Sequence, residues 1–187
     1  MEDSQKESVV IRMVAVLSMI VIAAALRIAP HPWNLTPVGA MAVFSGALVR
    51  DRRLALAFPL LALFAGDLFI GFNKLIPVVY GSFLVNVLIG CFLKDNRTIA
   101  RVGGATFLAA LQFFVVTNFS VWALLGSYPR TGAGLFSCYV NGLPLFWNTL
   151  AGDLLYAALL FGGFALAERA FPSVRQQSLD PARNHAG

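Results

Sequence analysis

Residues 117–156 read TNFSVWALLGSYPRTGAGLFSCYVNGLPLFWNTLAGDLLY, and this stretch decides the fold. It begins deep in one apolar segment and leaves it through an aromatic, glycine-rich loop. It then returns into a second apolar segment that carries Asn148, Thr149 and Asp153. Polar side chains are costly at membrane depth, so they usually face the interior of a helix bundle or a cavity. We therefore expect the other apolar segments to form the walls of a polar site.

The composition of the whole chain indicates an integral membrane protein. Hydrophobic residues make up 58% of the 187 residues and charged residues only 12%, with a mean hydropathy of +0.75. A typical soluble domain has about 25% charged residues. The length suits one polytopic domain. The sequence contains no phosphate-binding GxxxxGK[ST] loop, so any energy from ATP would come from a partner chain.

The apolar segments predict an all-α membrane protein with about six transmembrane helices. The expected spans are residues 9–26, 35–49, 54–72, 75–93, 102–125 and 142–167. The membrane domain would cover residues 9–171, between cytoplasmic tails at 1–8 and 172–187.

Basic residues divide unevenly between the two sides of this arrangement. With a cytoplasmic N-terminus, the outer side holds only Arg27, Lys74 and Arg130. The inner side holds the rest: Lys6, Arg12, Arg50, Arg52, Arg53, Lys94, Arg97, Arg101, Arg169, Arg175 and Arg183. Because cytoplasmic loops carry an excess of Lys and Arg, both termini are expected in the cytoplasm. This placement accounts for the net charge of +5 without a nucleic-acid partner.

Polar residues in and beside the spans form the candidate substrate-binding site. At about 1.5 Å per helical residue they fall into two layers, with Asp67, Asn118 and Asn148 nearer the outer surface and Asn86 and Asp153 deeper. The full candidate set is Arg27, Asn34, Asp67, Asn86, Asn118, Trp122, Tyr128, Asn148 and Asp153. Hydrogen bonding between helices without any ligand would produce the same pattern, so both interpretations stay open.

The second span is short and rich in small residues, with Ala42 and Gly46 four positions apart. Small residues at this spacing allow close approach of two helices. The face can serve packing within the bundle or docking of a partner's helix.

A short internal sequence repeat suggests that the chain consists of two related halves. PLLALFAGDL at residues 59–68 resembles PLFWNTLAGDL at residues 144–154, and both end in Ala-Gly-Asp-Leu. The third and sixth spans run in opposite senses, so a duplication of three-span halves would give inverted repeats, which commonly frame a central site in transporters.

Catalytic motifs are absent from the sequence, which has no CxxC, HExxH or GxSxG. An aspartate pair can support intramembrane proteolysis, but Asp67 and Asp153 differ by about 7 Å in estimated depth. We therefore expect neither an enzyme nor a metal or cofactor site.

At the level of motifs, the chain resembles a bacterial family of S components, the substrate-binding membrane subunits of energy-coupling factor (ECF) transporters. The resemblance rests on residues 118–156, on PHPWNLTPVGAMAVFSGAL near the start and on PLLALFAGDL between them. It implies a six-helix S-component bundle in the bacterial inner membrane that captures a vitamin-like micronutrient from outside. It also implies a transmembrane coupling subunit and two ATPase subunits as partners.

One feature departs from several S components, because the AxxxA docking pattern is not evident in the first span, where Met19 follows Ala15 by four positions. Ala42 and Gly46 could take its place. The alternatives to transport are a membrane scaffold or assembly protein whose polar residues only tie helices together, and an unrecognised intramembrane lipid-modifying enzyme.

Overall fold

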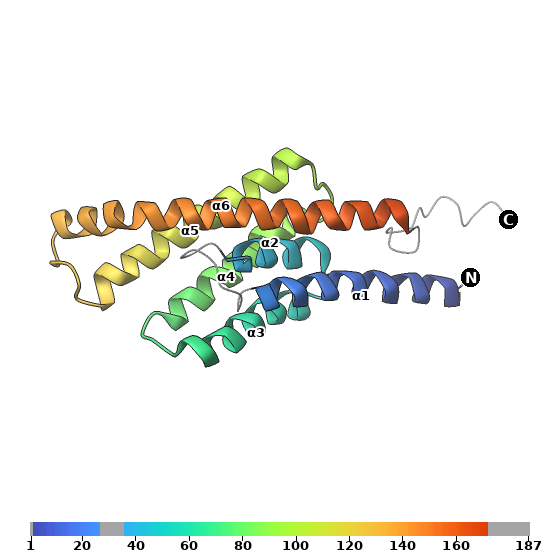
Figure 1. Ribbon diagram of the computed structural model, residues 1–187, viewed down its shortest axis with the longest axis horizontal. Coiled ribbons are helices and arrows are strands. Elements are labelled where there is room, and N and C mark those ends of the chain that lie inside the picture. Colours follow the sequence, from blue (N-terminus) through green and yellow to red (C-terminus); the bar gives the residue numbers. More distant parts are fainter. Residues whose placement is uncertain (1, 27–35, 172–187) are drawn as a thin grey trace.

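The computed structural model describes residues 2–26 and 36–171, which fold into six helices and no strand (Figure 1). The prediction of an all-α protein is confirmed. The helices are α1 (Glu2–Leu26), α2 (Val38–Leu48), α3 (Arg52–Ile70), α4 (Ile76–Cys91), α5 (Ile99–Leu124) and α6 (Gly132–Ala170).

Three of the helices begin at a polar residue that caps the first turn. Asp51 accepts hydrogen bonds from the backbone N–H groups of Arg53 and Leu54 at the start of α3. Thr98 caps α5 and Thr131 caps α6 in the same way. Side-chain acceptors at this position satisfy N–H groups that have no partner within the helix, so the local sequence sets where each helix starts.

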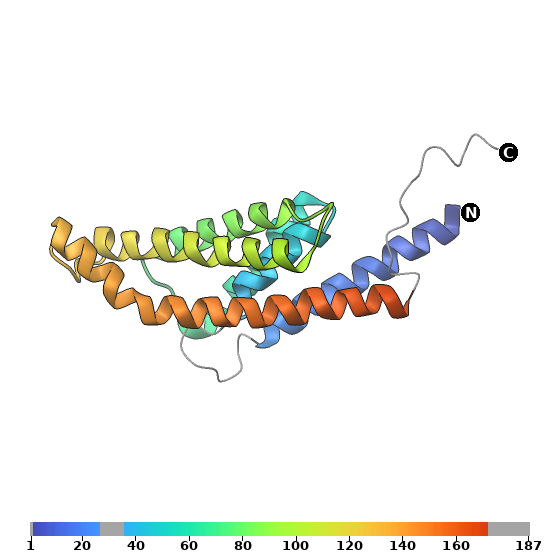
Figure 2. The same ribbon diagram turned by 90° about the horizontal axis from the view of Figure 1, so that it is seen from above.

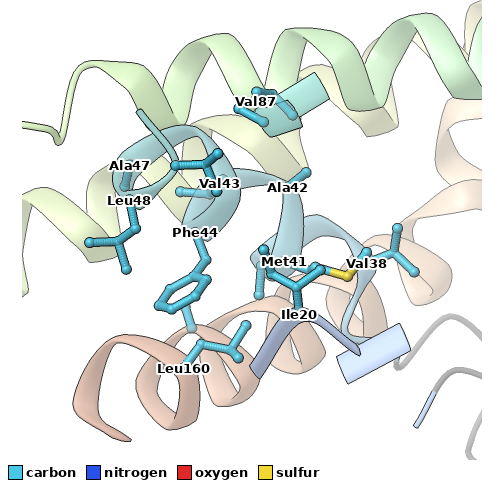
Figure 3. Packing of buried hydrophobic residues seen from close by; sticks show 14 of the residues in the cluster. Ile20, Val38, Met41, Ala42, Val43, Phe44, Ala47, Leu48, Val87 and Leu160 are labelled. Carbon is cyan, nitrogen blue, oxygen red and sulfur yellow. The ribbon is translucent and has the colours of Figure 1, made fainter. Parts of the chain in front are cut away.

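The short helix α2 forms the centre of the molecule. All of its residues are buried, and it contacts each of the other five helices. Those five surround it in a closed ring, in the order α1, α3, α4, α5, α6 and back to α1. Figure 3 shows α2 between Val87 of α4 and Leu160 of α6, and the Phe44 ring meets Phe161 edge-on at 5.2 Å. The core is therefore built around α2.

Helices α2 and α4 cross at backbone distance. A side chain at Gly46 would collide with the carbonyl of Val87, and a side chain at Gly90 would collide with the carbonyl of Val43. Ala42 is fully buried in the same helix. The face of Ala42 and Gly46 is thus filled within the chain, as the packing interpretation expects, and it is not exposed to a partner.

Helices α5 and α6 form a long hairpin that extends beyond the other helices at one end of the molecule (Figures 1 and 2). The sequence predicted a loop through the glycine-rich stretch before residue 142. Instead, α6 starts at Gly132 and continues through Pro144. Contacts with α5 hold this extension, because the Tyr139 hydroxyl donates to the Val115 carbonyl at 2.8 Å and Cys138 Sγ donates to the Asn118 carbonyl at 3.3 Å. The prediction of a loop there was wrong because tertiary contacts outweigh the low helix propensity of glycine.

The two similar segments, residues 59–68 and 144–154, also share a burial pattern. In both Ala-Gly-Asp-Leu segments, one in α3 and one in α6, the glycine and aspartate are buried and the flanking alanine and leucine are exposed. The two helices thus point the same part of the motif inward.

Large apolar side chains cover much of the outside of the bundle. Helices α5 and α6 are long and apolar enough to cross a membrane. Only 17% of the most apolar part of α5 and 33% of that of α6 are buried within the structure. An apolar helix in the core of a soluble protein would be mostly buried, so these two helices suggest a membrane protein.

The start of α1 and the end of α6 lie at the same end of the molecule (Figure 2). An ion pair joins them there, with Arg12 Nη1 3.0 Å from Glu168 Oε1. We call this end, which also carries the basic turn at residues 50–53, the inner end, and the opposite end the outer end.

Candidate functional site

The N-terminal end of α2 receives its cap from another helix. Pro37 precedes the helix and makes no side-chain cap. Instead, Oδ1 of the buried Asp153 in α6 accepts a hydrogen bond of 3.0 Å from the Ala40 N–H. Gly39 lies so close to the carboxylate that any side chain at this position would collide with it. A negative group at a helix N-terminus is favourable because it meets unpaired N–H groups and the positive end of the helix dipole.

Asp67 lies near the outer end of α3 and meets α4. Its side chain is 9% exposed, and Oδ2 accepts a hydrogen bond of 2.7 Å from the hydroxyl of Tyr80. This hydrogen bond ties α3 to α4 near the outer end.

The lengths of α2 and α3 set the depth of Asp67. Residues 49–51 join the two helices, and Ser45 Oγ donates to the Ala55 carbonyl, so the helices run antiparallel with their inner ends level. Helix α2, with 11 residues, rises about 16 Å, and α3, with 19 residues, rises about 28 Å. Asp67 therefore lies about 7 Å beyond the outer end of α2.

Asn148 reaches a similar level from the other side of α2. It precedes Asp153 by five positions in α6 and so lies about 7 Å further toward the outer end. Its side chain is half-buried. We call Asp67, Tyr80 and Asn148 the outer polar layer, since they are carried by three helices of the ring and lie beyond the end of the central helix.

Asn86 belongs to a separate, deeper cluster between α4 and α5. Gln112 Nε2 donates to Asn86 Oδ1 at 2.7 Å and to the Ser82 carbonyl at 2.9 Å. Ser82 is 3% exposed, and its Oγ has no hydrogen-bond partner within the described ranges. This cluster ties two helices of the ring together.

Asn118, Trp122 and Tyr128 lie in the α5–α6 hairpin. The Asn118 amide donates to the Phe114 carbonyl at 2.9 Å, and its oxygen lies against Gly142 of α6. Trp122 Nε1 donates to the Pro129 carbonyl at 2.9 Å, while Asn141 donates to the Tyr128 hydroxyl at 3.2 Å. These contacts close the hairpin and fix its tip.

An open cleft runs between α5 and α6 beside Asn118. It has space of about 120 Å³ and a mainly apolar lining. The lining residues are Ala110, Phe113, Phe114, Thr117, Asn118, Val121, Leu145, Phe146 and Thr149. The hydroxyls of Thr117 and Thr149 donate to carbonyls of their own helices, at 2.7 and 2.9 Å. The cleft therefore offers an apolar surface with few available donors.

The predicted outer layer thus divides into two groups. Asp67 and Asn148 belong to the outer polar layer, whereas Asn118 belongs to the hairpin. In the part of the chain that the structure covers, α3 contacts neither α5 nor α6, so Asp67 and Asn148 share an estimated level along the bundle but lie on helices that do not contact each other. Arg27 and Asn34 lie outside the described residues.

Two partners of the candidate residues were missed from the sequence, namely Tyr80 and Gln112. Gln112 carried a signal, because it is a long polar side chain in the middle of the 26 residues of α5. Tyr80 carried no such signal in the sequence, because tyrosine is common at the ends of membrane helices. Within residues 2–26 and 36–171, no three His, Cys, Asp or Glu side chains come together to hold a metal ion.

Comparison with known families gives one match. A family described as "Family of unknown function (DUF6580)" matches residues 7–174, from the first turns of α1 to just beyond α6. The chain belongs to the DUF6580 family. The match covers all six helices apart from the first residues of α1, so the DUF6580 unit includes both groups of candidate residues. No curated protein matches the chain. No solved structure matches it either.

Proposed function

We propose that this DUF6580 protein is a multi-pass protein of the bacterial inner membrane, with its inner end in the cytoplasm. The apolar exteriors of α5 and α6 support immersion in lipid. The uneven division of basic residues supports the orientation. In this arrangement all six helices lie in the membrane region. Helix α2, at about 16 Å, covers half of a hydrocarbon core of about 30 Å and relies on its connecting segments for the rest.

Within this membrane protein, the outer polar layer is proposed to bind a small molecule from outside. The observation that carries the proposal is the position of this layer. The central helix stops inside a ring of longer helices, and Asp67, Tyr80 and Asn148 lie beyond its end. Polar side chains inside a membrane bundle usually mark a binding or transport path. A carboxylate, a phenol and an amide together suit a ligand that presents several hydrogen-bond donors.

The transport class of this protein is proposed to be the S component of an ECF transporter. The sequence resemblance supports this class, and the size of the chain, with no ATP-binding loop in its sequence, fits a subunit that depends on ATPase partners. The chain would pair with a transmembrane coupling subunit and two ATPases, and it would itself catalyse no reaction.

Purification of the tagged full-length chain from its native membrane tests the transport class. In mild detergent, a fraction should elute with a coupling subunit and two ATPases, as identified by mass spectrometry. The complex should hydrolyse ATP, while the isolated chain should not. A chain that elutes reproducibly with no ATPase, and whose absence leaves the uptake of every tested micronutrient unchanged, would contradict the S-component assignment.

A membrane scaffold is the second candidate. It is favoured by two internal hydrogen bonds: Asn86 joins α4 to α5 through Gln112, and Asp153 of α6 caps α2. If the protein is a scaffold, replacing residues of the outer polar layer should lower its stability, and no loss of ligand binding should accompany this change.

A further inference from the structure

A buried polar cluster lies between α4 and α5. Ser82 and Asn86 are four positions apart in α4, so they share one face of that helix. Gln112 of α5 meets this face, where its Nε2 donates to Asn86 Oδ1 at 2.7 Å and to the Ser82 carbonyl at 2.9 Å. Ser82 and Asn86 are only 3% and 1% exposed. Bulk solvent therefore does not satisfy the polar groups of this cluster.

The hydroxyl of Ser82 differs from other hydroxyls in the helices. Its Oγ is buried and makes no hydrogen bond within residues 2–26 and 36–171. Five other hydroxyls donate to the carbonyl four positions earlier in their own helix, those of Ser18, Thr106, Thr117, Ser120 and Thr149. A buried hydroxyl without a partner carries the full cost of its desolvation. Such a group points to a partner outside the polypeptide, either water or an ion.

The two neighbouring amides favour water as this partner. The bonds of Gln112 use both N–H groups of its amide and one acceptor position of Asn86. They do not use the N–H groups of Asn86 or the amide oxygen of Gln112. Water suits a mixture of donors and acceptors, and a buried water molecule typically makes about three hydrogen bonds. A cation would need oxygen ligands and a counter-charge, whereas Ser82, Asn86 and Gln112 are neutral and the Asn86 oxygen already faces an N–H group.

We propose that one buried water molecule binds between α4 and α5, held by the Ser82 hydroxyl and the side-chain amides of Asn86 and Gln112. It bridges the two helices and satisfies the hydroxyl. Asn86 lies one turn from Gly90, where α4 crosses α2 at backbone distance, so the bridge also holds α4 at this crossing. The site is independent of the outer polar layer, because Tyr80 precedes Ser82 by two positions and points to another side of α4. It would remain if no small molecule binds there.

Thermal unfolding of the full-length protein in mild detergent tests the proposal through its sign. Ser82→Ala removes one partner of the water, so the midpoint should fall by about 2–4 °C, as expected for one net hydrogen bond in a chain of this size. Removal of a hydroxyl that has no partner would leave the midpoint unchanged or raise it, since alanine also favours a helix over serine. Ser120→Ala is the matched control, because Ser120 is buried as well but bonds to its own helix. Its midpoint should stay close to that of the wild type.

Solid-state NMR of the wild type in phospholipid bilayers detects the water directly and needs no variant. Magnetisation that starts on water protons should reach the side-chain amide nitrogens of Asn86 and Gln112. The transfer should decrease several-fold in Ser82→Ala and should match the wild type in Ser120→Ala. This measurement keeps the test decisive even if Ser82→Ala folds poorly.

Three results would overturn the proposal. The first is a Ser82→Ala midpoint at or above that of the wild type, or no lower than that of Ser120→Ala. The second is the absence of any transfer from water to the two amides in the wild type. The third concerns an ion in place of water: sodium chloride would raise the wild-type midpoint above its value in choline chloride at equal concentration, with no such rise in Ser82→Ala.

Discussion

Asp153 in α6 accepts a hydrogen bond of 3.0 Å from the backbone N–H of Ala40 in the first turn of α2, across 113 positions of the chain. The bond fixes the outer end of the central helix against the longest helix of the ring. Since α2 contacts all the other helices, this single carboxylate helps to set the register of the whole bundle. The deepest candidate residue on α6 is thus explained by helix capping.

Replacing Asp153 should destabilise the protein. Asp153→Ala removes the cap and leaves the Ala40 N–H buried without an acceptor, which costs about 1–3 kcal/mol. Asp153→Asn keeps an acceptor oxygen and should cost less. The midpoint of thermal unfolding in mild detergent measures both changes. An unchanged midpoint for Asp153→Ala would show that the contact contributes nothing.

Gly39 should be intolerant of a side chain for the same reason. In Gly39→Ala the new methyl group meets the Asp153 carboxylate, which must move and lose its bond to α2. We expect a loss of about 1–3 kcal/mol, in the range of overpacked cores. Gly104→Ala in α5 is the matched control, because nothing lies within contact of its added methyl group. Alanine favours a helix over glycine by up to ~1 kcal/mol, so the control should be neutral or more stable. Equal effects of the two substitutions would refute the close approach.

The crossing of α2 and α4 should depend on Gly90. Gly90→Ala places a methyl group against the Val43 carbonyl, where backbone must shift to make room, and unfolding should occur several degrees lower. Gly103→Ala, in open space on α5, serves as the comparison. A Gly90→Ala protein that unfolds with the wild type would mean that the helices cross at a larger distance.

Topology can be tested with single cysteines and an impermeant thiol reagent. A background with Cys91→Ser and Cys138→Ser removes both native thiols. In intact cells, Lys74→Cys near the outer end should be labelled, and Arg52→Cys at the inner end should react only after permeabilisation, because positive charge favours the cytoplasmic side. Labelling of Arg52→Cys in intact cells would reverse the orientation.

The helix plan could be predicted from the sequence because apolar segments, basic turns and polar caps each leave a local signal. All six helices occur near their predicted positions. The start of α6 could not be predicted, since its glycine-rich beginning is held by Tyr139 and Cys138 against α5. Local propensity carries no information about such a distant contact.

The candidate residues were recognised as polar groups in apolar segments, but their grouping could not be predicted. Depth along a helix can be counted from the sequence, whereas the face toward which a side chain points depends on packing. Asp67, Asn118 and Asn148 were expected at one level, yet the helix that carries Asp67 contacts neither of the helices that carry the two asparagines. The role of Asp153 depends on where α2 ends, which is also a property of the assembled bundle.

Ligand retention by variants of the outer polar layer tests the central claim most directly. The full-length protein, gently purified, is examined by native mass spectrometry and by thermal unfolding with a panel of vitamins and nucleobases. Ligand binding raises the unfolding midpoint because the ligand binds only the folded state. Asp67→Asn and Asn148→Ala should weaken binding by roughly 5- to 150-fold, equivalent to ~1–3 kcal/mol. Asn118→Ala in the hairpin is the control and should retain the ligand.

The predicted result is that the wild type and Asn118→Ala bind a compound and that Asp67→Asn and Asn148→Ala lose it. If no compound is carried through purification or shifts the midpoint, and Asp67→Asn and Asn148→Ala simply unfold at lower temperature, the outer polar layer is a set of ties between helices and the binding claim is wrong.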